Sequence, residues 1–529
     1  MLVWSYLYYV LFPPLFKFDM NRLPVLFILL GVLFGQARIG EWQAYTAPLH
    51  INDIAGFEQQ AVCGTNGGLL IYDQDENTFN TLTVIDQLAG TGVNVVEIGQ
   101  DGYLWLGGVS PDGFVQVYDL KTKNSIAEFD FGLTEIIDIS IADSIGFVAF
   151  LENQDWGLME FIYRDEWIYR DVYRNWPTDF ESINAIEIWD DEVMVATEQG
   201  LFVGDWRGSN LKDPTSWGQP YTTLSGNISS LHENGSNILL VHERNVYHLT
   251  PNTSTPLTLL WDYFSDTDQF IDITQDSDGF LWGILDRKFM KLSDTAIDWQ
   301  LDVQSKYSFT CLTKMPDGQI IAGSEIGITL IDQDNQTLNR EIPNAPLTNQ
   351  ISAVTVLNDG RLVAGSKYGL SIKESWGWRN IAESNEIILT PTYNELRFAV
   401  DYIPVDFGGF VADMEQGPDG LLYCAIRGTY PEPRRHGGGI IIIDIDNPEN
   451  FTLIDTAVLD YYANEYMIVK DLEFDASGIL WGANAYATTR GNPIAVRDAN
   501  KSWGSFSVTN SGNILSYTPN TIGFDSFGR

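Results

Sequence analysis

The chain is poor in the side chains that most enzymes use for chemistry. Its 529 residues include only three cysteines and five histidines. The histidines form no HExxH motif and no cluster with cysteine at the spacing of zinc ligands. They are His50, His232, His242, His248 and His436. We therefore predict that the protein is not an enzyme and has no cofactor and no metal centre.

The three cysteines also argue against a disulfide framework. Cys63, Cys311 and Cys424 are odd in number and far apart, and each lies in an apolar, strand-like run. A free cysteine packs as a small hydrophobic residue. The sequence therefore predicts three buried thiols in place of a disulfide or a metal site.

Basic residues are scarce as well. The chain has 30 Lys and Arg against 71 Asp and Glu, a net charge of −41. Such a field repels phosphate backbones and anionic membranes, so we expect no nucleic-acid partner. We interpret the acidic surface as a solubility device; the alternative is a docking face for cationic partners.

Long apolar runs are confined to the N-terminus. Asn21 and Arg22 precede an apolar stretch over residues 23–34, which Gly35-Gln36-Ala37 follows. A short basic start, an apolar centre and small residues at the end are typical of a signal peptide. We assign residues 1–37 to a signal peptide with an over-extended start, Met20 being the expected beginning. The alternative is an N-terminal membrane anchor.

A repeat dominates the rest of the chain. Its first apolar strands are expected to start 39 to 60 residues apart, at Ile51, Val93, Ile136, Ile183, Ile228, Phe270, Phe309, Ile351, Val411, Val469 and Pro519. In seven of these eleven units a glycine follows nine residues after the start, at Gly102, Gly279, Gly318, Gly360, Gly420, Gly478 and Gly528. Asp precedes five of these glycines, which is typical of a tight hairpin with positive φ.

Each unit continues with three further strands. An apolar pair such as Leu104-Trp105 follows the turn, then a run such as residues 68–73, then a more polar strand such as residues 126–131. Four short strands in every 40 to 50 residues, without a long 3.6-residue period, indicate an all-β chain of propeller blades. Stacked blades would bury Trp105, Trp282 and Trp481 between neighbours.

We expect two propellers of four-stranded blades. Seven units fit between Ile51 and Asp332, and a proline-rich break follows at residues 343–346. This places a first, seven-bladed propeller at residues 38–345 and a second, incomplete one at residues 346–529. Residues 41–45 are expected to form a lone strand that completes a distant blade. Because the sequence stops on the turn of the eleventh unit, we expect the second propeller to be truncated.

The most suggestive candidate site is a basic island in this acidic chain. The ninth unit has a long insertion after its second strand, and the tenth has a shorter one at the same point. In a propeller both loops open on one face, where binding sites usually form. Guanidinium groups recognise carboxylate and phosphate, and an exposed tyrosine can stack on a sugar ring. The candidate ligand-binding residues are Arg427, Tyr430, Arg434, Arg435, His436 and Arg490. The alternative is a solvated loop that merely covers the blades.

Two acidic motifs have competing interpretations. Residues 73–77 and 332–335 alternate carboxylate and amide oxygens, which suits Ca²⁺, but they lack the glycine and distal glutamate of an EF-hand. They also lie where the third strand turns into the fourth, where such side chains cap turns. Residues 277–282 invite comparison with the aspartate box of sialidases. That box has one residue between its Asp and its Gly, whereas here Asp278 and Gly279 are adjacent. We interpret all three motifs as turns.

The motifs resemble two groups of known propellers. Residues 51–54, 68–73 and 101–105 resemble the regulator-propeller repeats of bacterial sensor ectodomains. The order of signal peptide, Ile39-Gly40-Glu41-Trp42 and residues 51–55 is more similar to the surface-exposed propeller family of the type IX secretion system. The long insertion at residues 427–439 is also similar to that family.

The second resemblance implies a non-catalytic component at the cell surface and outer membrane. It implies two seven-bladed propellers and a C-terminal β-sandwich sorting domain, which is absent from this sequence. It further implies partners: the sortase and other attachment-complex proteins of type IX secretion, and anionic lipopolysaccharide presented for cargo anchoring. The alternative is a periplasmic, oligosaccharide-sensing ectodomain of a hybrid two-component regulator. A propeller lyase or glycosidase would need a catalytic constellation, which we do not find.

Overall fold

A computed structural model describes residues 42–262, 269–293, 296–302, 308–332, 337–382, 402–404, 407–428, 436–512 and 515–525. Residues 1–37, assigned to the signal peptide, lie outside these ranges. The described residues form β-strands and three short 3-10 helices, at Val84–Asp86, Pro214–Ser216 and Ala463–Glu465. None of the helices in these ranges is long and apolar enough to cross a membrane. The expected all-β class is confirmed.

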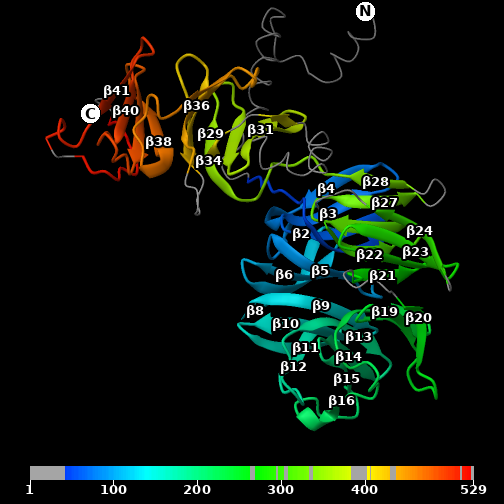
Figure 1. Cartoon of the computed structure of the whole chain (residues 1–529). Helices are drawn as coiled ribbons and strands as arrows, with labels where there is room; N and C mark the ends of the chain where they lie inside the picture. Colours follow the sequence, from blue (N-terminus) through cyan, green and yellow to red (C-terminus); the bar gives the residue numbers. More distant parts are fainter. Residues whose placement is uncertain are drawn as a thin grey trace, which may run out of the picture. The chain divides into compact units, whose positions relative to one another are not determined.

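Residues 51–341 form seven antiparallel sheets of four consecutive strands (Figure 1). They are β1–β4 (Ile51–Phe57, Gln60–Thr65, Gly68–Asp73, Thr78–Leu82), β5–β8 (Gly92–Ile98, Leu104–Ser110, Gly113–Asp119, Asn124–Leu133), β9–β12 (Glu135–Ala142, Ile145–Glu152, Asp155–Tyr163, Trp167–Tyr173), β13–β16 (Ile183–Trp189, Glu192–Thr197, Gly200–Asp205, Trp217–Gly218), β17–β20 (Ile228–Asn234, Asn237–His242, Asn245–Leu249, Leu257–Asp262), β21–β24 (Asp272–Gln275, Leu281–Leu285, Lys288–Ser293, Ala296–Asp302) and β25–β28 (Phe309–Lys314, Ile320–Ser324, Ile328–Asp332, Thr337–Glu341). The first strands contact one another in chain order, and β25 contacts β1.

Three more four-stranded groups follow. They are β29–β32 (Ile351–Val356, Leu362–Ser366, Gly369–Glu374, Gly377–Ala382), β34–β37 (Gly409–Gln416, Leu422–Gly428, Gly439–Ile443, Phe451–Ile454) and β38–β41 (Ile468–Phe474, Leu480–Ala485, Ile494–Arg497, Trp503–Phe506). The short strand β33 (Tyr402–Pro404) pairs with β32 in parallel, and a bridge between Arg427 and Ile468 joins the last two groups into one sheet.

The turn glycines have the conformation that the repeat predicts. Gly102, Gly279, Gly318, Gly360, Gly420 and Gly478 have φ between +76° and +93°. Each donates its backbone N–H to the carbonyl three residues earlier, as Gly279 does to Asp276. In Gly279 a Cβ would meet no atom within 4 Å, so the backbone conformation alone favours glycine there. Gly528 lies outside the described residues.

A bulge occurs at the second residue of nearly every unit, counted from the expected start of its first strand. In β1 the pairing with β2 skips Asn52, and the same irregularity recurs in the later sheets. In four units the residue after the bulge is an aspartate: Asp53, Asp138, Asp413 and Asp471. Asp272 holds the same third position in its unit, where the pairing of β21 with β22 is regular. Bulges re-aim side chains, and here they precede an aspartate that reaches the neighbouring sheet.

Each of these aspartates accepts a backbone N–H from the next unit. We call this contact the inter-sheet latch. Its donors are Val96 to Asp53 (2.9 Å), Ile186 to Asp138 (2.7 Å), Leu312 to Asp272 (2.8 Å), Leu472 to Asp413 (2.8 Å) and Ile522 to Asp471. The donor is always the fourth residue of its unit. In the first four of these latches the donor lies on a first strand, so the latch satisfies backbone groups on strands that are not otherwise paired with each other.

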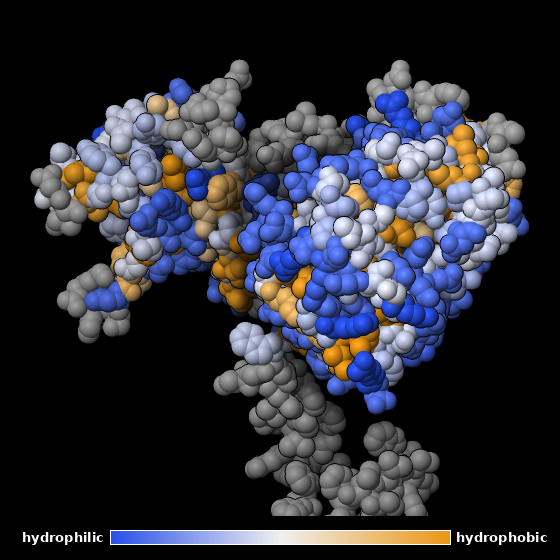
Figure 2. All heavy atoms as spheres, turned by 90° about the horizontal axis from the view of Figure 1, so that it is seen from below, coloured by the Kyte–Doolittle hydropathy of each residue, from blue (hydrophilic) through white to orange (hydrophobic). Residues whose placement is uncertain are grey.

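The core lies between the sheets. Trp105 is fully buried between β5–β8 and β9–β12, and Trp282 between β21–β24 and β25–β28. Trp481 is only half-buried and contacts Phe506 and Phe524. Figure 2 shows hydrophilic residues over much of the visible surface, with hydrophobic residues in separate patches. This distribution is in keeping with the acidic composition.

Two expected strands differ from the structure. Residues 42–49 contain no strand, because β28 already provides the fourth strand of its own sheet. Instead, the Leu49 carbonyl accepts the N–H of Gly327 at 2.7 Å. Residues 519–525 are not a strand either, since no ladder partner occurs for them in the described part of the chain. Their register is nevertheless the expected one, because Ile522 occupies the latch position beside Asp471.

Candidate functional sites

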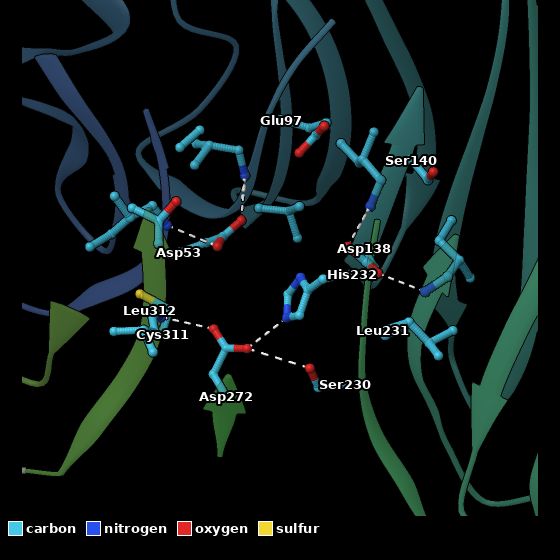
Figure 3. A pocket seen from close by; sticks show the side chains of 18 of the residues that line it. Asp53, Glu97, Asp138, Ser140, Ser230, Leu231, His232, Asp272, Cys311 and Leu312 are labelled. Carbon is cyan, nitrogen blue, oxygen red and sulfur yellow. Dashed lines mark hydrogen bonds and ion pairs between the residues drawn. The ribbon is translucent and has the colours of Figure 1, made fainter. Parts of the chain in front are cut away.

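The seven first strands between residues 51 and 341 surround a polar channel. The cavity has a volume of about 560 Å³ and is lined by every one of these strands. Its acidic and histidine side chains are Asp53 on β1, Glu97 on β5, Asp138 on β9, Glu187 on β13, His232 and Glu233 on β17 and Asp272 on β21. Figure 3 shows Asp53, Glu97, Asp138, His232 and Asp272 around one cavity.

Most of the channel carboxylates are held by backbone N–H groups. Asp53 accepts from Ile54 and Val96, and Asp138 accepts from Ile139 and Ile186. Burial raises the pKa of Asp53 to about 6 and that of Asp138 to about 7, although these N–H groups oppose the shift. The neighbouring carboxylates also raise both values.

His232 and Asp272 form an ion pair across two sheets. The imidazole Nε2 lies 2.7 Å from the Asp272 Oδ1. Burial opposes the charged imidazolium, but the attraction of Asp272, supported by Glu187 and Asp138, outweighs it and raises the pKa of His232 to about 9. His232 is therefore positively charged at neutral pH.

Glu97 differs from Asp53, Asp138, Glu187 and Asp272. Its carboxyl group makes no hydrogen bond or ion pair with any described residue. Burial, followed by repulsion from Glu187, Asp53 and Asp138, raises its pKa well above the usual range. Glu187, by contrast, accepts hydrogen bonds from the backbone N–H groups of Ile188 and Glu233 and from the Ser140 hydroxyl.

The charge on His232 predicts a pH-dependent stability. A folded-state pKa raised from 6.5 to about 9 contributes stability that is fully present below pH 6.5 and is lost as the pH rises through about 9. We expect the stability difference between the wild type and His232→Gln to shrink over that interval, as measured by urea unfolding at a series of pH values. His242→Gln, on the neighbouring strand β18, is the control. A difference that stays constant with pH would contradict the assignment.

The predicted basic island is only partly within the described residues. Tyr430, Arg434 and Arg435 lie outside them. Arg427 is exposed near the end of β35, with its guanidinium carbon 5.2 Å from the centroid of the Phe410 ring. His436 is exposed where the insertion returns to the sheet.

Both insertions are anchored on one segment, the connection between β37 and β38. Met467 in this connection accepts the N–H of Gly428 and donates its own N–H to Gly437, at 3.0 Å each. Tyr461 in the same connection accepts the N–H of Thr489 at 3.1 Å. The bases of the two predicted loops therefore meet the same stretch of chain.

Arg490 holds this connection together. Its backbone N–H donates to Asp460, whose carboxylate is buried, at 2.8 Å. Its guanidinium donates to the carbonyls of Thr456 and Leu459 and lies 6.0 Å from the Tyr461 ring centroid. Part of the Arg490 guanidinium is thus engaged within the protein. Tyr486, in the same insertion, is 48% exposed.

The other motifs have structural roles. Asp73 accepts the N–H groups of Asp75 and Glu76 at 3.1 Å each and caps the turn between β3 and β4. Residues 277–282 form a hairpin turn, which Asp276 caps while also accepting the Trp282 Nε1–H at 2.8 Å. Residues 333–335 lie outside the described ranges. No three His, Cys, Asp or Glu residues that the structure describes are placed to hold a metal ion.

The predictions for cysteine are confirmed, and the histidines are scattered. Cys63, Cys311 and Cys424 are buried free thiols. His242 lies beside the Ser225 carbonyl, and His248 beside Gln275. The channel acids, in contrast, were not anticipated. A signal for the aspartates was available in the sequence, because an aspartate recurs at the third position of five units.

Comparisons with known proteins show a fold likeness. No family model and no curated protein match the chain. The solved structure of PorZ, an essential bacterial surface component of the type IX secretion system of Porphyromonas gingivalis, matches with a TM-score of 0.64 and 16% identity over 90% of this chain. The match covers 61% of the PorZ chain, so this sequence spans less than two thirds of that protein's length.

Two further structures match less closely. The extracellular domain of a putative hybrid two-component system from B. thetaiotaomicron has a TM-score of 0.41 and 13% identity, over 92% of this chain and 69% of its own. The WD40 β-propeller domain of Doa1 has a TM-score of 0.41 and 10% identity, over 54% of this chain and 95% of its own. The chain is therefore similar in fold to PorZ.

Proposed function

We propose that the protein is a non-catalytic, exported surface component of a type IX secretion and attachment machine, acting as PorZ-like proteins do at the cell surface. The fold likeness to PorZ over 90% of the chain supports this role. In the proposed architecture, residues 38–345 form a closed seven-bladed propeller, and residues 346–529 belong to a second one. The contact between β1 and β25 supports closure of the first ring.

The proposed ligand is anionic lipopolysaccharide, which the protein would present to the sortase for cargo anchoring. One observation carries this assignment: the two arginine-bearing insertions share one anchoring segment, residues 455–467. Arginines on both loops would then face one ligand, and guanidinium forks suit its phosphate and carboxylate groups. The exposed Tyr486 offers a ring on which a sugar can stack.

Substitution of the insertion arginines tests this function. The Arg434→Ala/Arg435→Ala variant removes two guanidinium groups, and each charge-assisted hydrogen bond contributes about 1.5–3 kcal/mol. We therefore expect retention of anionic lipopolysaccharide in a pull-down to fall by about tenfold or more. Arg427→Ala should weaken retention less, because it removes one group at the base of the loop.

The matched control changes the same charge elsewhere. Arg207→Ala/Arg287→Ala removes two exposed arginines from the part of the chain before residue 341, where each pairs with an aspartate. This control should retain lipopolysaccharide as the wild type does. Equal retention by all variants would remove the insertion as a binding site, and equal loss would indicate attraction by overall charge alone.

A further inference from the structure

We propose that the channel bounded by the seven first strands binds an organic polycation of the polyamine type, with Glu97 as its main contact. This proposal concerns the part of the chain before residue 341 and does not depend on the arginine loops. The ligand is described by its chemistry: two or more ammonium groups on a flexible chain. Figure 3 shows Glu97 at the cavity, away from the His232–Asp272 pair.

The channel acids are unevenly distributed and form an acidic arc. Asp53, Glu97, Asp138 and Glu187 come from four consecutive first strands, β1, β5, β9 and β13. The next strand, β17, carries the exposed Glu233 and also His232, which pairs with Asp272 on β21. Acidic groups are thus concentrated along one side of the cavity, where low-dielectric walls focus the field of those that are ionised.

Glu97 is the member of the arc that is open for a ligand. The other three acids accept backbone N–H groups, which fix their positions. The Glu97 carboxylate contacts no donor within the described residues, although it lies deep among the strands and is only partly accessible. A carboxylate in such a place is costly unless a donor pairs with it. An ammonium group would provide both the opposite charge and the hydrogen bonds.

The spacing favours an extended cation over a metal ion. In the parts of the chain that the structure describes, no three acidic or histidine side chains converge closely enough to hold one ion. The cavity, at about 560 Å³, is also far larger than a single ion requires. A flexible chain with several ammonium groups can contact Glu97 and reach the charge of the neighbouring acids at the same time.

Calorimetric titration of the full chain with spermidine tests the proposal. We expect saturable binding that weakens by about tenfold in Glu97→Gln, because one charged contact is removed. Glu97→Asp, which keeps the charge, should bind more tightly than Glu97→Gln. Glu128→Gln is the matched control, since it makes the same change on β8 of the same sheet at an exposed position.

Each outcome decides the proposal. Absence of spermidine binding, or equal affinities for wild type and Glu97→Gln, would overturn it. If Glu128→Gln loses as much spermidine affinity as Glu97→Gln, the binding is due to general attraction by the acidic surface. Calcium is tested at the same ionic strength. If calcium binds, if its binding depends on Glu97 and if it displaces spermidine, the channel is a metal-ion site. Retention of lipopolysaccharide by the same variants should stay unchanged, which separates this result from that of the arginine loops.

Discussion

Replacing Trp105 by alanine is expected to lower the free energy of unfolding by about 3–5 kcal/mol. Trp105 is fully buried between β5–β8 and β9–β12. Its ring centroid lies 5.5 Å from that of Phe161 and 4.8 Å from that of Trp167, in edge-to-face geometry. The substitution therefore leaves a large cavity between two sheets. Urea unfolding followed by far-ultraviolet circular dichroism measures the effect without relying on tryptophan fluorescence.

Two companion variants make this result specific. Trp105→Phe should cost clearly less than Trp105→Ala, because the phenyl ring fills most of the volume and the indole Nε1–H has no hydrogen-bond partner to lose. Trp481→Ala should also cost less, because Trp481 is only half-buried. If Trp481→Ala proves as destabilising as Trp105→Ala, burial between sheets is not what stabilises the repeat.

Replacing Asp272 by alanine is expected to lower the free energy of unfolding by about 3 kcal/mol or more. Asp272 accepts the N–H groups of Ile273 and Leu312 at 2.8 Å each and pairs with His232. The substitution leaves two backbone donors without their acceptor and leaves the imidazolium without its counter-charge. The same unfolding measurement applies.

The control for Asp272 is the exposed turn residue Asp278 in the same sheet. Asp278→Ala should change stability by no more than about 0.5 kcal/mol. The double variant Asp272→Ala/His232→Leu should recover part of the loss, because it removes the unpaired charge. If Asp272→Ala behaves like Asp278→Ala, the latch contributes nothing measurable to stability.

The repeat was predictable because its signals are local. Gly279 and its counterparts fix a turn that needs positive φ, and the strands before and after follow from alternating apolar residues. The expected first-strand starts accordingly agree with the structure to within two residues from Ile51 to Val469. The segment at residues 42–45 failed as a strand because strand formation needs a free sheet edge, and β28 occupies that edge.

The sites were harder to predict because they assemble from distant parts of the chain. Asp53 and Val96 are in contact only once two sheets are stacked, so neither residue alone indicates a latch. Glu97 and Asp138 share a cavity for the same reason. The sequence shows that Arg490 can donate hydrogen bonds to a ligand. Its hydrogen bonds to Leu459 and Asp460 depend on the path of the connection between β37 and β38, which the sequence does not show.

The position of the inter-sheet latch has a consequence for how this architecture can diversify. The latches of Asp53, Asp138, Asp272 and Asp413 each join two first strands, and none of these four involves the loops that leave the sheets. Asp413 accepts the N–H of Leu472, 59 positions further along the chain, at the same distance of 2.8 Å at which Asp272 accepts that of Leu312, 40 positions further along. Long segments can therefore be inserted at the periphery without altering the alignment of the centre. New binding surfaces can arise there while the scaffold stays intact.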